Sequence, residues 1–429
     1  MLTRISNRSH DIFEKIFGTQ FSKEGFIAYA NNVQWFTLAR FISLALSFLT
    51  TILIARLFGP EQFGILNYVI SIIGLFSILS NFGISATLYK ELTLKKEKRE
   101  EIFGSALTLN YITATTTFII VLISLFFIRE SFYVKSLIVL LSLTFLTQPM
   151  NLLSFDFLKD REGKYVAITQ IITLIVSSFL KILITYLYSS VTFFILILVA
   201  ENLISGAIYI YQIKKIKFRN LSFKIQNEQI KYIFYSSLPL ILYSAFSEIY
   251  SRIDQIMLRS YVDITTVGIY SASVKVTEMW YLVPNILLGA LFPALANVKN
   301  DRNEYNKRYN ILLIALVISS ILISCFIFLF KEGIINLIYG NEFSSAANIL
   351  GVYIFSIVGF FVSSLIYQDL FLNKNKWAIT IIPFLTALIN ILLNLILIPA
   401  KGAVGAALAT TVSYNLVPLC IYLYKKIIK

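Results

Sequence analysis

The stretch YNILLIALVISSILISCFIFLF, residues 309–330, decides the fold class of this 429-residue chain. It contains no charged residue, and its length matches the ~20 residues with which an α-helix spans the hydrocarbon core of a membrane. Similar apolar stretches recur from Trp35 to the C-terminus. The chain is 57% hydrophobic, with a mean hydropathy of +0.77. The sequence therefore predicts an all-α polytopic membrane protein, without the ~10-residue alternating segments of a transmembrane β-barrel.

Twelve candidate membrane spans follow from the same pattern. They cover residues 33–57, 63–88, 102–128, 134–157, 165–188, 191–213, 234–258, 264–296, 309–330, 345–371, 377–398 and 402–424. We expect the long span at 264–296 to break near Pro284, because proline removes a hydrogen bond from a helix interior. The connections between spans are short, which leaves no room for a soluble domain.

The spans divide the chain into four parts. Residues 1–32 form an N-terminal tail, 33–213 an N-lobe of six helices, 214–233 a basic linker, and 234–429 a C-lobe of six helices. Apolar residues at helical spacing in the tail favour an amphipathic helix on the membrane surface. A frayed tail is the alternative.

Lysine and arginine are distributed unevenly over the connections. With the N-terminus in the cytoplasm, 27 of the 37 fall in inner segments, 6 in outer loops and 4 inside spans. This bias obeys the positive-inside rule and predicts a multi-pass protein with both termini in the cytoplasm. Topology and contact with anionic membrane lipids explain the net charge of +14, so nucleic acid is not an expected partner.

Few residues could support metal or nucleotide chemistry. The one histidine, His10, lies in the tail, and Cys325 and Cys420 fall in predicted spans as small packing residues. No P-loop sequence occurs in the chain. We expect no metal site, no cofactor and no catalytic activity. Without a P-loop, any energy source would be an ion gradient, a substrate's own gradient or a partner protein.

The two halves of the chain resemble each other weakly. At an offset of 204 residues, three residues of the second span match three of the eighth: Gly64, Asn81 and Ala86 match Gly268, Asn285 and Ala290. Because six is even, both halves start on the same side of the membrane. Such repeats are related by an axis along the membrane normal, with a cleft between two lobes, and transport by alternating access is typical of this architecture.

Three groups of motifs carry a resemblance to a known family. They are Ala55–Gly64 (ARLFGPEQFG) with Asn81-Phe82-Gly83; Asp254–Leu258 (DQIML) with Val267–Ala272 (VGIYSA) and Pro293; and Leu372-Asn373-Lys374 with Asn390, Asn394, Ile398-Pro399 and Gly402–Thr410 (GAVGAALAT). In the order and spacing of these motifs, the chain resembles the polysaccharide transporters of the MOP superfamily. These are the Wzx-type flippases for O-antigen and other polysaccharide repeat units.

The resemblance implies a MATE-like fold of two six-helix lobes around a central cavity. It implies a flippase of the bacterial inner membrane that moves an undecaprenyl-diphosphate-linked oligosaccharide from the cytoplasmic to the outer leaflet. It also implies coupling to H⁺ or Na⁺, with polysaccharide polymerases and glycosyltransferases as candidate partners. Related drug exporters share the fold, so a drug or metabolite cation antiporter is the alternative. The lipid II flippases usually carry fourteen helices, so twelve count against that type.

The stretch SEIYSRIDQIMLRS, residues 247–260, brings charges into an apolar span. On a helix, Glu248, Arg252, Gln255 and Arg259 form one polar stripe. Intramembrane charges are costly unless they face a partner or a wet cavity, so we expect the stripe to line the cleft between the lobes. A diphosphate needs charge-assisted donors, for which we nominate the cations inside spans: Arg252, Lys275, Lys181 and Arg40.

An ion-pair interpretation of these charges remains open. Glu248 and Arg252 are four residues apart, and Lys275 and Glu278 three, so each pair can neutralise itself. Lys181 and Arg40 have no acid at helical spacing. For ion coupling the candidate carboxylates are Asp254, Glu278, Glu248 and Asp369. Asp254 is favoured, because it has no base on its own helix face, whereas Asp369 lies near the inner end of its span.

Overall fold

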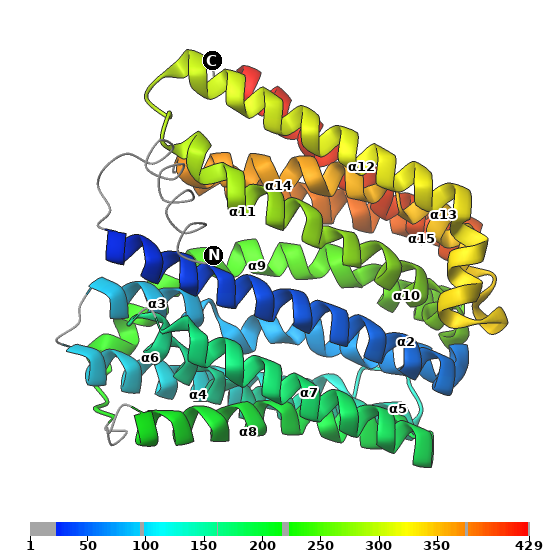
Figure 1. The fold of residues 1–429 in the computed structure, drawn as a ribbon. Coiled ribbons are helices and arrows are strands. Elements are labelled where there is room, and N and C mark those ends of the chain that lie inside the picture. Colours follow the sequence, from blue (N-terminus) through cyan, green and yellow to red (C-terminus); the bar gives the residue numbers. More distant parts are fainter. Residues whose placement is uncertain (1–22, 95–97, 161, 217–222, 374–375, 428–429) are drawn as a thin grey trace, which may run out of the picture.

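The computed structural model describes residues 23–94, 98–160, 162–216, 223–373 and 376–427 (Figure 1). These ranges are helical almost throughout and contain no β-strand, which confirms the predicted all-α class. Most of the predicted tail, residues 1–22, lies outside the described part of the chain. From Lys23 onward the tail belongs to the first described helix, α2 (Lys23–Asn81).

Eight helical segments of the described chain are long and apolar enough to cross a membrane. Two of them hold two crossings each, because they bend at a glycine. α2 bends at Gly59, where φ is 68°, and α15 (Lys376–Ile427) bends at Gly402, where φ is 56°. Glycine adopts positive φ without the steric penalty that a Cβ brings, so at both bends the chain turns between two apolar stretches.

Two further crossings are interrupted by charges or by a break. α9 (Asn227–Tyr261) carries the charged stripe. α10 (Ile264–Glu278) and α11 (Leu282–Ala296) are separated by the 3₁₀ turn Met279–Tyr281. The described residues thus hold twelve crossings, as predicted. The break precedes Pro284, since a proline leaves the carbonyl four residues earlier, that of Trp280, without its helical donor.

The remaining helices complete the two halves. They are α3 (Ile84–Leu94), α4 (Arg99–Ser124), α5 (Phe132–Thr147), α6 (Ser154–Leu158), α7 (Gly163–Tyr188), α8 (Val191–Ile216), α12 (Arg302–Tyr339), α13 (Ala346–Tyr353) and α14 (Ser356–Leu372). Figure 1 shows two groups of helices lying side by side, α2 to α8 in one group and α11 to α15 in the other. α9 and α10 lie where the groups meet, packed against α2.

The bundle has two ends with different charge. The last turns of α3, α6, α8 and α11 and the first turns of α4, α7, α9 and α12 lie at one end, here called the basic end (Figure 1). The bends at Gly59 and Gly402 and the connections α4–α5, α9–α10 and α12–α13 lie at the opposite end. The predicted topology places the basic end in the cytoplasm.

The first turns of α9 contact the N-lobe. The Tyr232 hydroxyl donates to a carboxylate oxygen of Glu91 at 2.9 Å, and the hydroxyls of Ser237 and Thr87 lie 2.8 Å apart. The rings of Phe234 and Phe82 stack with their centroids 4.9 Å apart. α9 therefore begins on one lobe and ends between the two, and the predicted lobe boundary at residue 234 falls inside this continuous helix.

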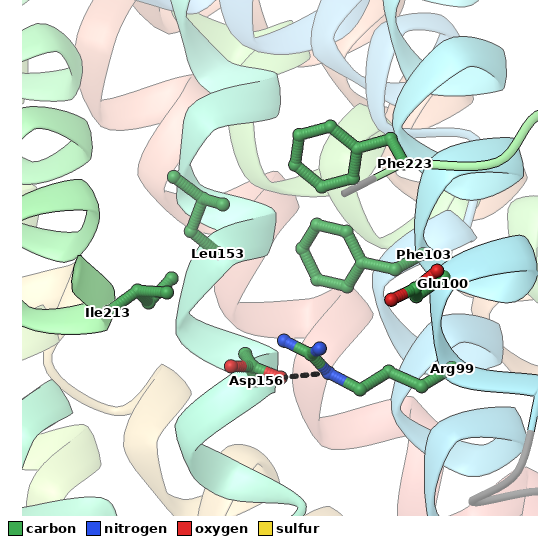
Figure 2. Close-up of a pocket in the computed structure, with 7 residues that line it drawn as sticks. All are labelled: Arg99, Glu100, Phe103, Leu153, Asp156, Ile213 and Phe223. Atoms are coloured by element: carbon green, nitrogen blue, oxygen red, sulfur yellow. Dashed lines mark hydrogen bonds and ion pairs between the residues drawn. The ribbon is translucent and has the colours of Figure 1, made fainter. Parts of the chain in front are cut away.

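A buried charge cluster stabilises the basic end of the N-lobe (Figure 2). Arg99 Nε lies 2.7 Å from Asp156 Oδ1, and Lys159 Nζ lies 3.4 Å from the same oxygen. Burial lowers the pKa of the Lys159 ammonium, and the Asp156 carboxylate partly offsets this shift. Phe223, from the linker, stacks on Phe103 beside the cluster, with ring centroids 5.7 Å apart.

The variant Asp156→Ala is expected to destabilise the protein by about 3 kcal/mol, because it removes the buried carboxylate with which the partly buried cations Arg99 and Lys159 both pair. Asp156 is only 1% exposed, whereas Glu304, which pairs with Arg308 at 2.8 Å, is 37% exposed. Glu304→Ala is therefore the matched control, with an expected loss below about 1 kcal/mol. Thermal unfolding of both variants in detergent measures the difference, and equal losses would contradict the role given to the cluster.

Candidate functional site

The charged stripe of α9 and its counterpart on α10 form two ion pairs. Arg252 Nε lies 2.6 Å from Glu248 Oε2, and Lys275 Nζ lies 2.8 Å from Glu278 Oε2. The four side chains are between 31% and 38% exposed. Both pairs that the spacing allowed are thus present. Their partial exposure leaves each cation accessible to a further ligand, because a single carboxylate does not occupy all donors of a guanidinium or an ammonium.

Arg252 also touches the other lobe. A Cβ built on Gly74 of α2 would lie 2.3 Å from Arg252 Nε, so the guanidinium group rests against the bare backbone at Gly74. One turn further along α9, Gln255 Oε1 accepts hydrogen bonds from Ser71 at 2.8 Å and from Ser271 at 3.4 Å. The stripe therefore lies at the contact of α2 with α9 and α10.

Asp254 lies at the centre of a buried polar network in the C-lobe. Its carboxylate accepts hydrogen bonds from the Tyr270 hydroxyl, from Thr410 Oγ1 at 3.3 Å and from the Gln255 backbone N–H at 2.8 Å. Thr410 in turn accepts from Asn390 Nδ2 at 3.3 Å. Asp254 is 1% exposed. In the described part of the chain, hydroxyl and amide groups surround this carboxylate, and it forms no ion pair there.

The network ends on an amide oxygen without a donor. Asn394 Nδ2 donates to Asn390 Oδ1 at 3.0 Å, while Asn394 Oδ1 is buried and accepts no hydrogen bond. Both asparagines are fully buried in α15. A carboxylate beside neutral oxygens is the kind of site that binds a proton or a hard cation, which oxygen donors prefer. The described residues contain no group of three or more histidine, cysteine, aspartate or glutamate side chains that could hold a metal ion.

Asn390, Asn394 and Thr410 were not among the predicted site residues. Their signal was present in the sequence, because two asparagines four residues apart interrupt an otherwise apolar span. Their connection to Asp254 depends on α15 packing against α9, which the sequence pattern does not specify.

The structure separates the other predicted site residues from this region. Lys181 pairs with Glu201 of the neighbouring helix α8 and lies over the Phe194 ring, 5.4 Å from its centroid. Helical spacing relates Lys181 only to residues of its own helix, so it did not indicate this partner. Asp369 lies near the basic end and accepts from the Tyr305 hydroxyl and from Asn373 Nδ2, the latter at 2.8 Å.

Arg40 belongs to α2, and its side chain lies outside the described residues. The structure therefore brings together five of the eight predicted site residues, on α9 and α10: Glu248, Arg252, Asp254, Lys275 and Glu278.

The two lobes meet at the opposite end through two glycines of the predicted repeat. A Cβ on Gly64 would lie 2.0 Å from the Ile264 carbonyl oxygen, and a Cβ on Gly268 would lie 1.9 Å from the Pro60 carbonyl oxygen. Pro60 and Ile264 are also 204 positions apart. Equivalent residues of the two halves thus cross at a local two-fold axis, backbone against backbone.

An arginine from each lobe supports this crossing. Arg259 of α9 makes two hydrogen bonds to Glu130, in the α4–α5 connection, at 2.8 and 2.9 Å. Arg56 of α2 donates to the last carbonyls of α12, those of Leu337 and, at 2.7 Å, Ile338. The opposite end is therefore closed by contacts from both lobes.

Comparison with known proteins identifies the family. Residues 29–299 match the family described as polysaccharide biosynthesis protein. The chain belongs to this family. Over 404 residues it is 25% identical to a capsular polysaccharide biosynthesis protein of Staphylococcus aureus, with 92% of this chain and 98% of the relative covered. It is 24% identical to a probable low-salt glycan biosynthesis flippase of Haloferax volcanii, with 88% and 79% covered.

Solved structures confirm the fold. A lipid II flippase, MurJ, in an inward closed conformation matches with a TM-score of 0.73 at 19% identity, covering 91% of this chain and 87% of that one. An outward-facing multidrug resistance transporter of the MATE family and MOP superfamily matches with a TM-score of 0.65 at 12% identity, covering 92% and 95%. The chain is thus a multi-pass membrane protein that shares the fold of these two proteins.

Proposed function

We propose that this protein is a flippase that moves a lipid-linked oligosaccharide repeat unit across the bacterial inner membrane by alternating access. Family membership and the glycan-related names of its relatives support the substrate class. The single observation that carries the proposal is the pair of partly exposed cations, Arg252 and Lys275, on the two helices that pack against α2. The family resemblance implies movement from the cytoplasmic to the outer leaflet, and the charge bias predicts both termini in the cytoplasm.

The two cations provide a path for the diphosphate group. Each is paired, but each retains N–H donors beyond those directed at its carboxylate. Phosphate oxygens form charge-assisted hydrogen bonds with such donors, and arginine offers the better multidentate geometry. Arg252 is therefore the main diphosphate ligand and Lys275 a second one. The substrate's negative charge competes with Glu248 and Glu278, so neither cation holds it irreversibly.

Asp254 couples transport to a cation. A chain of hydrogen bonds inside the C-lobe links its carboxylate through Thr410 and Asn390 to Asn394. Uptake of H⁺ or Na⁺ would neutralise the buried charge, and this changes the free energy of the packing between α9 and α15. Glycosyltransferases would supply the substrate at one membrane surface, and polysaccharide polymerases would consume it at the other.

Arg252→Ala tests the substrate path. Loss of a hydrogen bond to a charged group costs about 1.5–3 kcal/mol, so transport should fall about 10- to 100-fold. The host gene is deleted and complemented with the variant. Surface polysaccharide and polyprenyl-diphosphate oligosaccharide on the cytoplasmic side are then measured. Loss of the first and accumulation of the second is the expected result.

Arg308→Ala is the matched control, because Arg308 forms the same kind of pair with Glu304, four residues away, at 2.8 Å and with similar exposure. It should complement the deletion fully. Equal effects of the two variants would mean that Arg252 serves only its ion pair. Unchanged surface polysaccharide in the deletion strain, with new sensitivity to cationic drugs, would replace the flippase with a drug antiporter.

A further inference from the structure

The contact between Gly74 and Arg252 joins the two lobes at the level of the candidate site. A Cβ at position 74 would lie 2.3 Å from Nε, 2.5 Å from Cδ and 2.7 Å from Cζ of Arg252. Heavy atoms do not approach to these distances without displacement. The guanidinium end of Arg252 therefore occupies the volume that any side chain at position 74 would fill.

The glycine at position 74 needs a structural explanation, because glycine is unfavourable in a helix interior. Gly74 lies well inside α2, fifteen positions past the bend at Gly59. Its backbone supports no bend of its own, since its φ is not among the positive values in the described chain. What the missing side chain provides is room for Arg252, whose Nε also lies 2.6 Å from Glu248 Oε2.

We propose that Gly74 is a positioning residue for Arg252: its bare backbone seats the guanidinium group at the contact between the two lobes. This inference rests on the proposed function, because it concerns the residue that binds the diphosphate. Glu248 fixes the guanidinium along α9, and Gly74 fixes it against α2. With both restraints, the donors that Glu248 does not use keep one direction.

The contact of the Arg252 guanidinium group with the backbone at Gly74, here called the seat, also depends on the arrangement of the lobes. Arg252 belongs to α9 and Gly74 to α2, so this contact exists only while the two helices touch. The neighbouring bond from Ser71 to Gln255, 2.8 Å long and buried, marks the same contact. When the helices separate, Arg252 keeps only Glu248, which is four residues away on its own helix. Glu248 then competes with the substrate for a guanidinium that is free to turn, which favours release.

Gly74→Ala tests the seat without altering the arginine. The colliding atoms belong to the end of a flexible side chain, so Arg252 is expected to move while the helices stay packed. Purified protein in vesicles is supplied with polyprenyl-diphosphate oligosaccharide isolated from the deletion strain. The apparent KM should rise about tenfold or more while the maximal rate changes little, because a binding group is misplaced rather than a helix lost.

A double-mutant cycle separates positioning from packing. If Gly74 acts only through Arg252, Gly74→Ala should have no further effect on KM in an Arg252→Ala background. Gly289→Ala, in α11, is the control, because a Cβ there would meet nothing within 4 Å. Additive effects of Gly74→Ala and Arg252→Ala, or a KM for Gly74→Ala equal to that of Gly289→Ala, would overturn the proposal.

Melting temperatures distinguish a failure of the seat from a failure of the proposed function. Gly74→Ala should lower the melting temperature, and adding Arg252→Ala should restore it, because the collision is removed. If Arg252→Ala leaves KM unchanged while this restoration occurs, the seat stands and the diphosphate role of Arg252 is wrong. If no restoration occurs, the seat itself is wrong.

Discussion

Replacing Gly64 or Gly268 with leucine is expected to abolish transport, with a loss of about 100-fold or more. A Cβ at either position would lie within 2.0 Å of a carbonyl oxygen of the other lobe. The obstructing atoms are backbone atoms, so no side-chain rotation relieves the overlap. The helices would have to separate at the opposite end, and overpacking of this kind costs about 1–3 kcal/mol or more.

Chemical accessibility measures the separation directly. In a variant with Cys325 and Cys420 replaced by serine, Ser71→Cys places a reporter at a residue that is 1% exposed in the closed contact. A membrane-impermeant thiol reagent added from outside should label this cysteine rapidly in Gly64→Leu and slowly in the parent. Gly333→Leu is the control, because a Cβ at Gly333 would meet nothing within 4 Å. If Gly64→Leu is labelled and transports like the parent, the glycine contact does not close the opposite end.

The internal repeat explains why the contact between the lobes at Gly64 and Gly268 could be anticipated in part from the sequence. Gly64 and Gly268 were recognised as equivalent by their offset of 204 residues, and equivalent points of a two-fold repeat can meet only at the axis. The twelve crossings were predictable for a different reason: the bilayer allows few alternatives to an apolar helix. The bend at Gly59 lies in the connection between two predicted spans, and the bend at Gly402 lies at the first residue of the last predicted span.

Side-chain contacts between different helices could not be predicted. Lys181 lacked an acid at helical spacing, yet Glu201 on the next helix pairs with it. The N-lobe contacts of Ser237 and Tyr232 lie in the first turns of a helix assigned mainly to the C-lobe. Periodicity along one helix reports which side chains share a face. It does not report which neighbouring helix that face meets.

Asp254→Asn is expected to uncouple the protein and to lower ion-driven transport at least about 100-fold, which corresponds to roughly 2.7 kcal/mol. Asparagine has nearly the same shape, so hydrogen bonds from Tyr270 and Thr410 to the remaining oxygen can persist. What disappears is the charge that attracts a proton or a cation into a fully buried site. The variant should therefore fold with a melting temperature close to that of the wild type, and lose its response to an ion gradient.

Vesicles with either a Na⁺ gradient or a pH gradient identify the ion and test the assignment together. One of the two gradients should accelerate wild-type transport and leave Asp254→Asn unaffected. Asp263→Asn is the matched control. Asp263 caps α10 by accepting from the Thr266 backbone N–H at 2.7 Å, and asparagine caps a helix about equally well.

If Na⁺ is the ion, it should also raise the melting temperature of the wild type but not of Asp254→Asn, because a ligand that binds only the folded state stabilises it. Gradient-driven transport by Asp254→Asn at the wild-type rate would exclude this carboxylate and leave Glu248, Glu278 and Asp369 to be tested in the same way.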